Sequence, residues 1–191
     1  MRIAILSMST FASPALHYGG EVYPWNVARG LHELGHHVTL YAAPGSLPPD
    51  PTCHECKLRY ILGTYGESNI QREWWVVDNY YDEIIQQHDL VLDFAHNHPV
   101  AETAGWFYPE HQNKIIVVLN GTTSNTPRCG PYNVVVGSQK WKELLVNGRT
   151  QFYGTPLEKQ MGGSLHENIP EVNIVGIVPW RIDTNFYRPS G

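Results

Sequence analysis

Two histidines stand close together after an apolar segment of the chain. Residues 89–94 (Asp-Leu-Val-Leu-Asp-Phe) have the composition of a buried strand, and Ala95-His96-Asn97-His98-Pro99 follows directly. A histidine on such a loop can bind a sugar hydroxyl, move a proton or hold a metal. The chain has 10 histidines, so a close pair also arises by chance. We predict that His96 is catalytic and that His98 is an ordinary residue of a surface loop.

Two adjacent glycines and an acidic residue precede an expected helix. Tyr18-Gly19-Gly20-Glu21 comes after the first apolar segment, residues 2–7. Glycines let the backbone approach a ligand, and the free amides of a helix N-terminus attract an anion such as a diphosphate. A turn that needs glycine only to reverse the chain gives the same pattern. The fingerprint Gly-x-Gly-x-x-Gly is absent, which argues against an NAD or FAD enzyme. We predict that Gly19, Gly20 and Glu21 bind substrate.

A dense set of neutral hydrogen-bonding groups follows the apolar residues 114–119. Residues 120–126 read Asn-Gly-Thr-Thr-Ser-Asn-Thr, which suits a ligand with many hydroxyl groups and also an ordinary polar loop. The substrate-binding residues predicted in this segment are Asn120, Gly121 and Thr122. Ser138 joins them because it follows an expected strand, although its place before a helix favours an N-cap.

The sequence Cys53-His54-Glu55-Cys56 has the spacing of half a zinc site. A second pair of ligands at short spacing would be expected, and only Cys129 and scattered histidines remain. A redox pair would follow a thioredoxin-like strand, which is missing here. We therefore predict a reduced thiol pair in a loop, and neither a metal nor a cofactor.

The elements that must position these residues alternate along the chain. Apolar and β-branched runs predict strands at residues 2–7, 37–43, 58–62, 89–94, 114–119, 133–137 and 172–178. Between several of them, apolar residues recur at helical spacing. This alternation predicts an α/β fold, a Rossmann-like, doubly wound and mostly parallel sheet of about seven strands. Ligands bind such sheets at the carboxyl ends of the strands.

Three expected helices have recognisable ends. The first carries apolar residues from Val22 to Leu34 and is followed by Gly35, a residue type common after a helix. The second begins at Ser68-Asn69-Ile70-Gln71, which fits a capping box. The third covers residues 99–107 and begins with proline.

Composition and charge exclude several classes of protein. Hydrophobic residues make up 42% and charged residues 16%, as in a folded globular chain. The net charge of −5 lacks the basic excess of a nucleic-acid-binding protein. No apolar run reaches the length of a membrane span. The 3 cysteines are too few for a disulfide framework, so we predict a cytoplasmic protein. Aromatic residues such as Trp106 and Tyr108 could stack on a saccharide or fill the core.

Segments at the two ends of the chain carry a family resemblance. Near the start they are Arg2-Ile3-Ala4-Ile5-Leu6, Tyr18-Gly19-Gly20-Glu21 and the run Leu31-His32-Glu33-Leu34-Gly35-His36 before the second strand. Near the end, residues 178–189 read Val-Pro-Trp-Arg-Ile-Asp-Thr-Asn-Phe-Tyr-Arg-Pro. Together they resemble the N-terminal domain of family 4 glycosyltransferases, which have the GT-B fold. The order of the strands extends the resemblance across the middle of the chain.

The resemblance implies transfer of a sugar from a nucleotide-sugar donor to a saccharide or other hydroxyl acceptor, with retention of configuration and without a metal. Two Rossmann-like halves face each other in this family, and the glycine pair lies against the donor diphosphate. Residues 1–178 would be the acceptor-side half, and residues 179–191 would begin the interdomain linker. The donor-binding half would lie in cis or on a separate chain, and this chain alone would be inactive.

The sequence departs from the family pattern near the expected reaction centre. Asn120 stands where the family often has a histidine, and an amide cannot act as a base at neutral pH. His96 would then take the place of the missing imidazole. Two alternatives stay open: a non-catalytic sugar-binding or scaffolding subunit, and a nucleotide-sugar epimerase of the GT-B fold.

Overall fold

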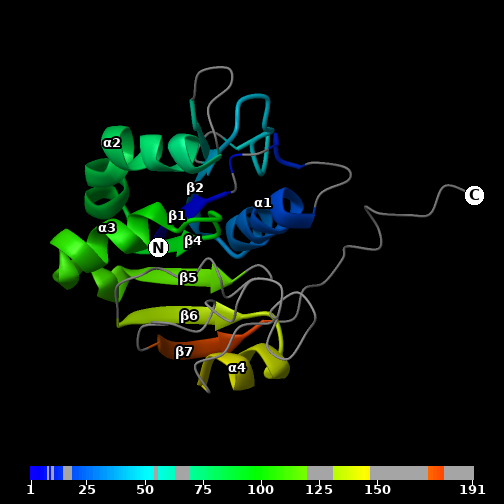
Figure 1. Cartoon of the computed structure of the whole chain (residues 1–191). Coiled ribbons are helices and arrows are strands. Elements are labelled where there is room, and N and C mark those ends of the chain that lie inside the picture. The colour runs from blue at the N-terminus through cyan, green and yellow to red at the C-terminus, as the bar shows by residue number, and fades with distance from the viewer. Residues whose placement is uncertain are drawn as a thin grey trace, which may run out of the picture.

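Seven parallel strands form a single sheet. The computed structural model describes residues 1–7, 9, 11–14, 19–53, 56–62, 69–119, 131–146 and 172–178. The strand order is β3-β2-β1-β4-β5-β6-β7, and all neighbouring strands are parallel (Figure 1). The strands are β1 (Arg2–Leu6), β2 (His37–Ala42), β3 (Lys57–Tyr60), β4 (Leu90–Asp93), β5 (Ile115–Leu119), β6 (Tyr132–Val136) and β7 (Val172–Ile177). The predicted α/β, Rossmann-like fold class is confirmed.

The helices cover both faces of this sheet. Helix α1 packs on one face, and α2 and α3 pack on the other (Figure 1). The described helices are α1 (Gly19–Glu33), α2 (Asn69–Gln87), α3 (Pro99–Phe107), the 3-10 helix η1 (Pro109–Lys114) and α4 (Gln139–Val146). After α1 the chain turns at Gly35, whose φ of 85° is a conformation that favours glycine.

Each face of the sheet has its own hydrophobic core. On the α1 face, Trp25 and Ala28 pack on alternate residues of the central strands, among them Ile3, Ile5 and Leu40. On the opposite face, residues of three helices pack against the intervening strand positions; they include Val76, Ile84, Val100, Ala104 and Leu145. Alternation of side chains along a strand explains this division, because strand residues two apart share a face.

The strand order reverses at β1, which lies between β2 and β4. Ile3 pairs with Val38 of β2 on one side and with Leu90 of β4 on the other. The connection after β1 therefore runs through α1 toward β2, and the connection after β4 runs through α3 toward β5 in the opposite direction. Such a switch point opens a crevice at the carboxyl ends of the two strands.

The predicted strands overlap the observed ones and differ by at most two residues at either end. The 3-10 helix η1 was not predicted, because a short 3-10 helix has no apolar period. Within the described residues, no helix has the length and apolar character needed to cross a membrane. The expected linker, residues 179–191, lies outside the described part of the chain.

Candidate functional site

A histidine and two buried glutamates meet at the switch point. His96 follows β4, Glu21 lies in the first turn of α1 after β1, and Glu73 comes from the first turns of α2. Glu21 and Glu73 are only 3% and 1% exposed. Buried carboxylates are costly unless they are hydrogen-bonded or paired with a cation, so their partners define the site.

The Glu73 carboxylate accepts hydrogen bonds from two consecutive residues of the β4–α3 loop. One oxygen accepts from the backbone N–H of His96 at 3.0 Å and lies 3.2 Å from His96 Nδ1. The other accepts from the Asn97 backbone N–H at 2.9 Å and from the Asn97 side-chain amide at 2.7 Å. Both backbone and ring of His96 are therefore fixed. Because Nδ1 faces Glu73, Nε2 is the ring nitrogen that can be offered to a ligand.

The electrostatics favour a cationic His96. Its hydrogen bond with Glu73 raises the pKa of the imidazole above 6.5, against the opposing effect of burial, and the charges of Glu73 and Glu21 add to the rise. Burial would raise the pKa of Glu73, but the hydrogen bonds from His96 and Asn97 outweigh it and lower that pKa below 4.5. Glu73 is therefore an ionised partner for the ring at neutral pH.

Glu21 lies near the same imidazole in a different environment. Burial raises the pKa of its carboxyl group above 4.5, and backbone hydrogen bonds and the charge of His96 offset part of the rise. A serine pair supports this turn: Ser13 Oγ donates to the Glu21 carbonyl oxygen at 3.0 Å and lies 3.2 Å from Ser7 Oγ at the end of β1. Two carboxyl groups whose environments shift their pKa in opposite directions thus flank His96.

His98 is buried, so the expectation of a surface residue was wrong. It is 2% exposed, and its Nδ1 lies 3.4 Å from Asp93 Oδ1. Asp93 also accepts the backbone N–H of Ala95 at 3.0 Å. His98 has a φ of 44°, a left-handed conformation that is uncommon for residues other than glycine. The Asp93–His98 pair thus fastens the turn from β4 into α3.

The other predicted substrate-binding residues have different outcomes. Gly19 and Gly20 open α1, as expected of residues that place a helix N-terminus at the switch point. Ser138 lies before α4, and its Oγ accepts the backbone N–H of Trp141 at 3.3 Å, the geometry of an N-cap. The remaining ones lie outside the described residues; they are Asn120, Gly121 and Thr122.

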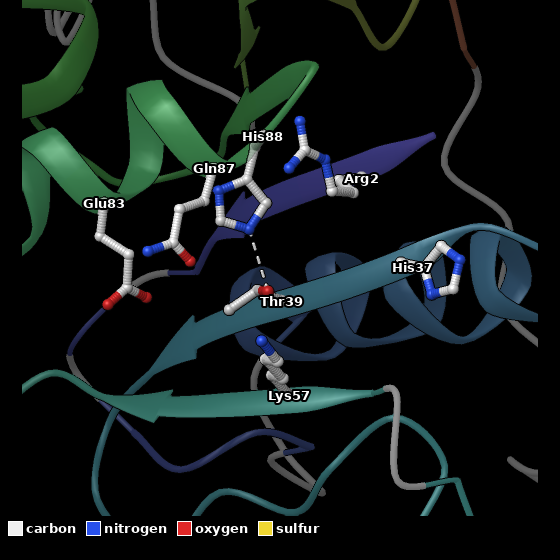
Figure 2. Close-up of a pocket in the computed structure, with 7 residues that line it drawn as sticks. All are labelled: Arg2, His37, Thr39, Lys57, Glu83, Gln87 and His88. Atoms are coloured by element: carbon white, nitrogen blue, oxygen red, sulfur yellow. Dashed lines mark hydrogen bonds between the residues drawn. The ribbon is translucent and has the colours of Figure 1, made fainter.

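A cavity of about 470 Å³ lies at the edge of the sheet formed by the amino ends of the strands, opposite to the edge that carries His96 (Figure 2). It is lined by residues at the starts of three strands, namely Arg2, His37 and Lys57. Its other wall includes His88, whose ring lies 3.0 Å from both Ile84 O and Thr39 Oγ1. Burial lowers the pKa of His88, which favours the neutral ring. Nδ1–H then donates to Ile84 and Nε2 accepts from Thr39, so this histidine ties α2 to β2 and is not held for a ligand.

Exposed aromatic side chains at the end of α3 also belong to the opposite edge. Trp106 and Tyr108 are 60% and 43% exposed. Helix α3 starts beside the carboxyl end of β4 and leads through η1 to the start of β5, so its last turn lies away from His96. The structure thus separates these rings from the cluster at the switch point.

Comparisons with known proteins give little on identity. No family model matches the chain. No curated protein matches it in sequence. Among solved structures, MurG from Acinetobacter baumannii is similar over 97% of this chain and 69% of its own, with 12% identity and a TM-score of 0.32.

Glu73 and Asp93 are the acidic residues that sequence reasoning missed. Glu73 stands among the apolar positions of a long amphipathic helix, where its charge suggests an exposed side chain. Asp93 is one residue of an apolar run. In both cases the available signal was an acidic residue at an otherwise apolar position. The hydrogen-bond partners of each acid lie in another segment of the chain, so the sequence did not identify them.

Proposed function

We propose that this chain is the acceptor-side domain of a glycosyltransferase of the GT-B fold, resembling family 4. It would act with a donor-binding domain, in cis or on a separate chain, to transfer a sugar from a nucleotide sugar to a hydroxyl group of an acceptor. We further propose that transfer retains the anomeric configuration and needs no metal at the reaction centre.

The observation that carries this proposal is the Glu21–His96–Glu73 cluster at the switch point. His96 follows β4, and the first turn of α1 follows β1, so both face the crevice where ligands of doubly wound sheets bind. The free amides of that first turn suit the diphosphate of a nucleotide sugar. The resemblance of both chain ends to family 4 agrees with this assignment.

The role proposed for His96 follows from its charge and orientation. Glu73 holds Nδ1 and raises the pKa of the ring, so a larger fraction of His96 is cationic near neutral pH. Nε2–H can then donate to an oxygen of the donor. As the bond between sugar and diphosphate breaks, negative charge grows on the departing diphosphate, and a fixed cationic donor stabilises that charge. In this role His96 would supply a positive charge, which the neutral amide of Asn120 lacks.

The proposal is tested on the full-length protein together with its donor-binding domain. Release of nucleoside diphosphate is measured over a panel of nucleotide sugars and saccharide acceptors. We expect His96→Ala to lower turnover by about 10²–10³-fold. His37→Gln, a change at an exposed histidine of the opposite edge, is the matched control and should leave turnover unchanged. Undiminished turnover of His96→Ala would contradict the role of His96, and binding of donor without turnover by the wild type would favour a sugar-binding subunit.

A further inference from the structure

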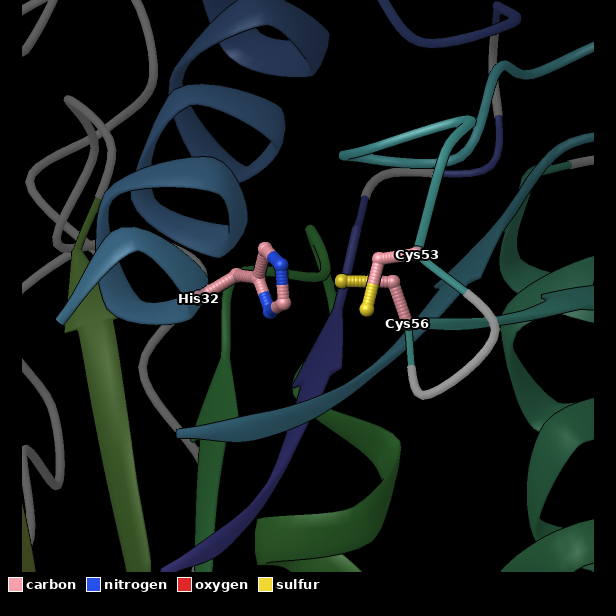
Figure 3. A group of neighbouring side chains, drawn as sticks. All are labelled: His32, Cys53 and Cys56. Atoms are coloured by element: carbon pink, nitrogen blue, oxygen red, sulfur yellow. The ribbon is translucent and has the colours of Figure 1, made fainter. Parts of the chain in front are cut away.

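Two cysteines and a histidine from different elements meet at the amino-terminal edge of the sheet. Cys53 and Cys56 precede β3, and His32 lies in the last turn of α1. One nitrogen of the His32 ring and the two sulfur atoms all lie within 4.8 Å of one another, with the ring facing the sulfur atoms (Figure 3). The third group comes from an earlier helix, which is why the spacing around the cysteines did not reveal it.

The His32 ring is held as metal-bound histidines usually are. Its Nε2 lies 3.4 Å from Asp50 Oδ2, and its Nδ1 is buried without a hydrogen-bond partner among the described residues. Asp50 is itself fixed, because its other oxygen accepts from the Thr52 backbone N–H at 2.8 Å and from the Thr52 hydroxyl at 2.7 Å. A carboxylate that orients one ring nitrogen commonly accompanies coordination by the other nitrogen. Coordination through Nδ1 would also satisfy the atom that is left unpaired.

We propose that Cys53, Cys56 and His32 form a zinc-binding site. Two thiolates and one imidazole are a ligand set that Zn²⁺ prefers, and Cys-x-x-Cys is a spacing found in structural zinc sites. Bonds of about 2.3 Å to sulfur and about 2.0 Å to nitrogen place tetrahedral ligand atoms roughly 3.5–3.8 Å apart. Three atoms within 4.8 Å reach this geometry by small side-chain movements. A water molecule would complete the fourth position, because Asp50 is already engaged with His32 Nε2 and Thr52.

The surroundings of Cys53 and Cys56 argue against a role as reactive thiols. Cys56 is only 8% exposed, and its sulfur atom lies beside the Cys53 sulfur and the His32 ring. Reactive cysteines usually lie in partly exposed, electropositive surroundings, whereas buried cysteines are usually structural. Both cysteines are free thiols in the structure, one half-buried and one buried, so each can act as a ligand.

The metal would fasten a segment that has little regular structure of its own. The chain between β2 and β3 contains Pro44, Pro48, Pro49 and Pro51 and forms no described helix or strand. It is held to α1 where Trp25 Nε1 donates to the Leu47 carbonyl oxygen at 3.1 Å and where Asp50 meets His32. Zinc would add a third attachment and contribute directly to folding free energy. Because this edge is opposite to His96, the proposed zinc has a structural role and does not depend on the proposed function.

The first test measures the metal itself. The chain is purified without an affinity tag under reducing conditions, and zinc is determined by mass spectrometry of the metal. We expect one zinc per chain. After replacement by Co²⁺, thiolate-to-cobalt charge-transfer bands and intense visible bands of a tetrahedral site should appear. Absence of zinc from the reduced protein, a cobalt spectrum without thiolate bands, or a stable Cys53–Cys56 disulfide in place of metal would each overturn the proposal.

The second test assigns the ligands and uses variants with a matched control. Cys53→Ser, Cys56→Ser and His32→Ala should each remove the stoichiometric metal. Asp50→Asn should keep the ligands and lower metal affinity by about 10–100-fold. His37→Gln, a change at an exposed histidine of the same edge, should bind zinc as the wild type does. Retention of full affinity by Cys56→Ser or His32→Ala would exclude this ligand set, and the cobalt spectrum of the wild type tests the site even if a variant fails to fold.

Discussion

The Glu73–His96 pair links the stability of the domain to the charge of its candidate site. The raised pKa of His96 means that its contribution to stability is complete below pH 6.5 and is lost as the pH rises through the pKa of the folded state. The lowered pKa of Glu73 means that its contribution is present above pH 4.5 and is lost as the pH falls through its folded pKa. The pair therefore stabilises the fold most between these limits, where imidazolium and carboxylate coexist.

Replacing the Glu73 carboxylate should separate its contribution to stability from its effect on the pKa of His96. In Glu73→Gln one side-chain oxygen remains as an acceptor, but an NH2 group replaces the second oxygen. In the wild type that second oxygen accepts hydrogen bonds from the backbone and the side chain of Asn97, so the variant sets donors against donors. We expect the free energy of unfolding to fall by about 1–3 kcal/mol, because buried donors lose their partner. We also expect the pKa of His96 to fall toward 6.5, since Glu73 is the main cause of its rise. NMR titration of the imidazole and denaturant unfolding measure the two quantities.

Glu83→Gln provides the matched comparison for that change. Glu83 lies on the same helix and accepts a hydrogen bond from Tyr41 at 2.9 Å, next to Arg59. Its replacement should lower stability and leave the titration of His96 unchanged. An equal shift of the His96 pKa in both variants would mean that Glu73 does not set it.

At the scale of single residues, position along the chain predicted part of the site. His96 and Glu21 were predicted as site residues because they follow expected strands, and the carboxyl ends of parallel strands gather at one end of the sheet. Glu73 was missed because its burial depends on two residues 23 and 24 positions away. His98 was misjudged because its partner Asp93 looked like part of an apolar strand. Hydrogen bonds between distant elements leave no periodic signal in a sequence.

Helix α2 is fastened near both ends by side chains that face different edges of the sheet. At its start, Glu73 binds the loop after β4, and just after its end, His88 binds Thr39 of β2. A movement of α2 would therefore displace the candidate site and the β2 contact together. The helix thus connects the two ends of the strands.

The buried, hydrogen-bonded ring of His88 predicts that the stability of the fold depends on pH. Its pKa is lowered in the fold, so its contribution is present above pH 6.5 and is lost as the pH falls below that value, because the unfolded chain binds the proton more readily. His88→Asn can keep the bond to Ile84 O but does not titrate. We expect this variant to be less stable than wild type by about 1–3 kcal/mol at neutral pH, with the difference shrinking toward pH 5. Denaturant unfolding across this range measures it, and a difference that grows on acidification would contradict the assigned neutral ring.

The start of α4 allows a capping role to be separated from a ligand role. Ser138→Ala removes the acceptor for the Trp141 N–H and should lower the free energy of unfolding by about 0.5–2 kcal/mol. Ser138→Asp supplies another good N-cap and should restore stability. We expect sugar-transfer activity to follow stability in both variants. Normal stability with lost activity in Ser138→Asp would instead place this hydroxyl against the substrate.

At the scale of elements, the strands were predictable and the faces of the helices less so. Continuous apolar runs in β5 and β1 reflect burial on both faces of a parallel sheet, a strong signal. In α2, Trp74 and Val77 lie three residues apart, as core residues of a helix often do, but both are only half-buried, while Val76 is buried. The spacing identifies a helix, but its rotation is set by the sheet and by α3, which it also contacts.

The two edges of the sheet divide the chemistry of the whole molecule. Acidic groups and His96 gather at the carboxyl ends of the strands, whereas His32, Cys53 and Cys56 lie at the amino ends. Zinc removal should therefore lower stability without changing the titration of His96. The domain can thus carry a structural metal although the proposed transfer needs none.

The balance of charge at the carboxyl edge limits how strongly this chain can hold a nucleotide sugar. Helices α2 and α4 begin there with Arg72, Lys140 and Lys142, but the buried carboxyl groups of Glu21 and Glu73 oppose them. The whole chain carries a net charge of −5. We therefore expect the 191-residue chain alone to bind nucleotide sugars with a Kd of about a millimolar or weaker, near −4 kcal/mol. Calorimetry measures the affinity, and the His96 imidazole resonances should shift on titration while those of His88 stay fixed. Micromolar binding would show that this chain by itself supplies most of the donor site, and a shift at His88 alone would place the ligand at the amino ends of the strands.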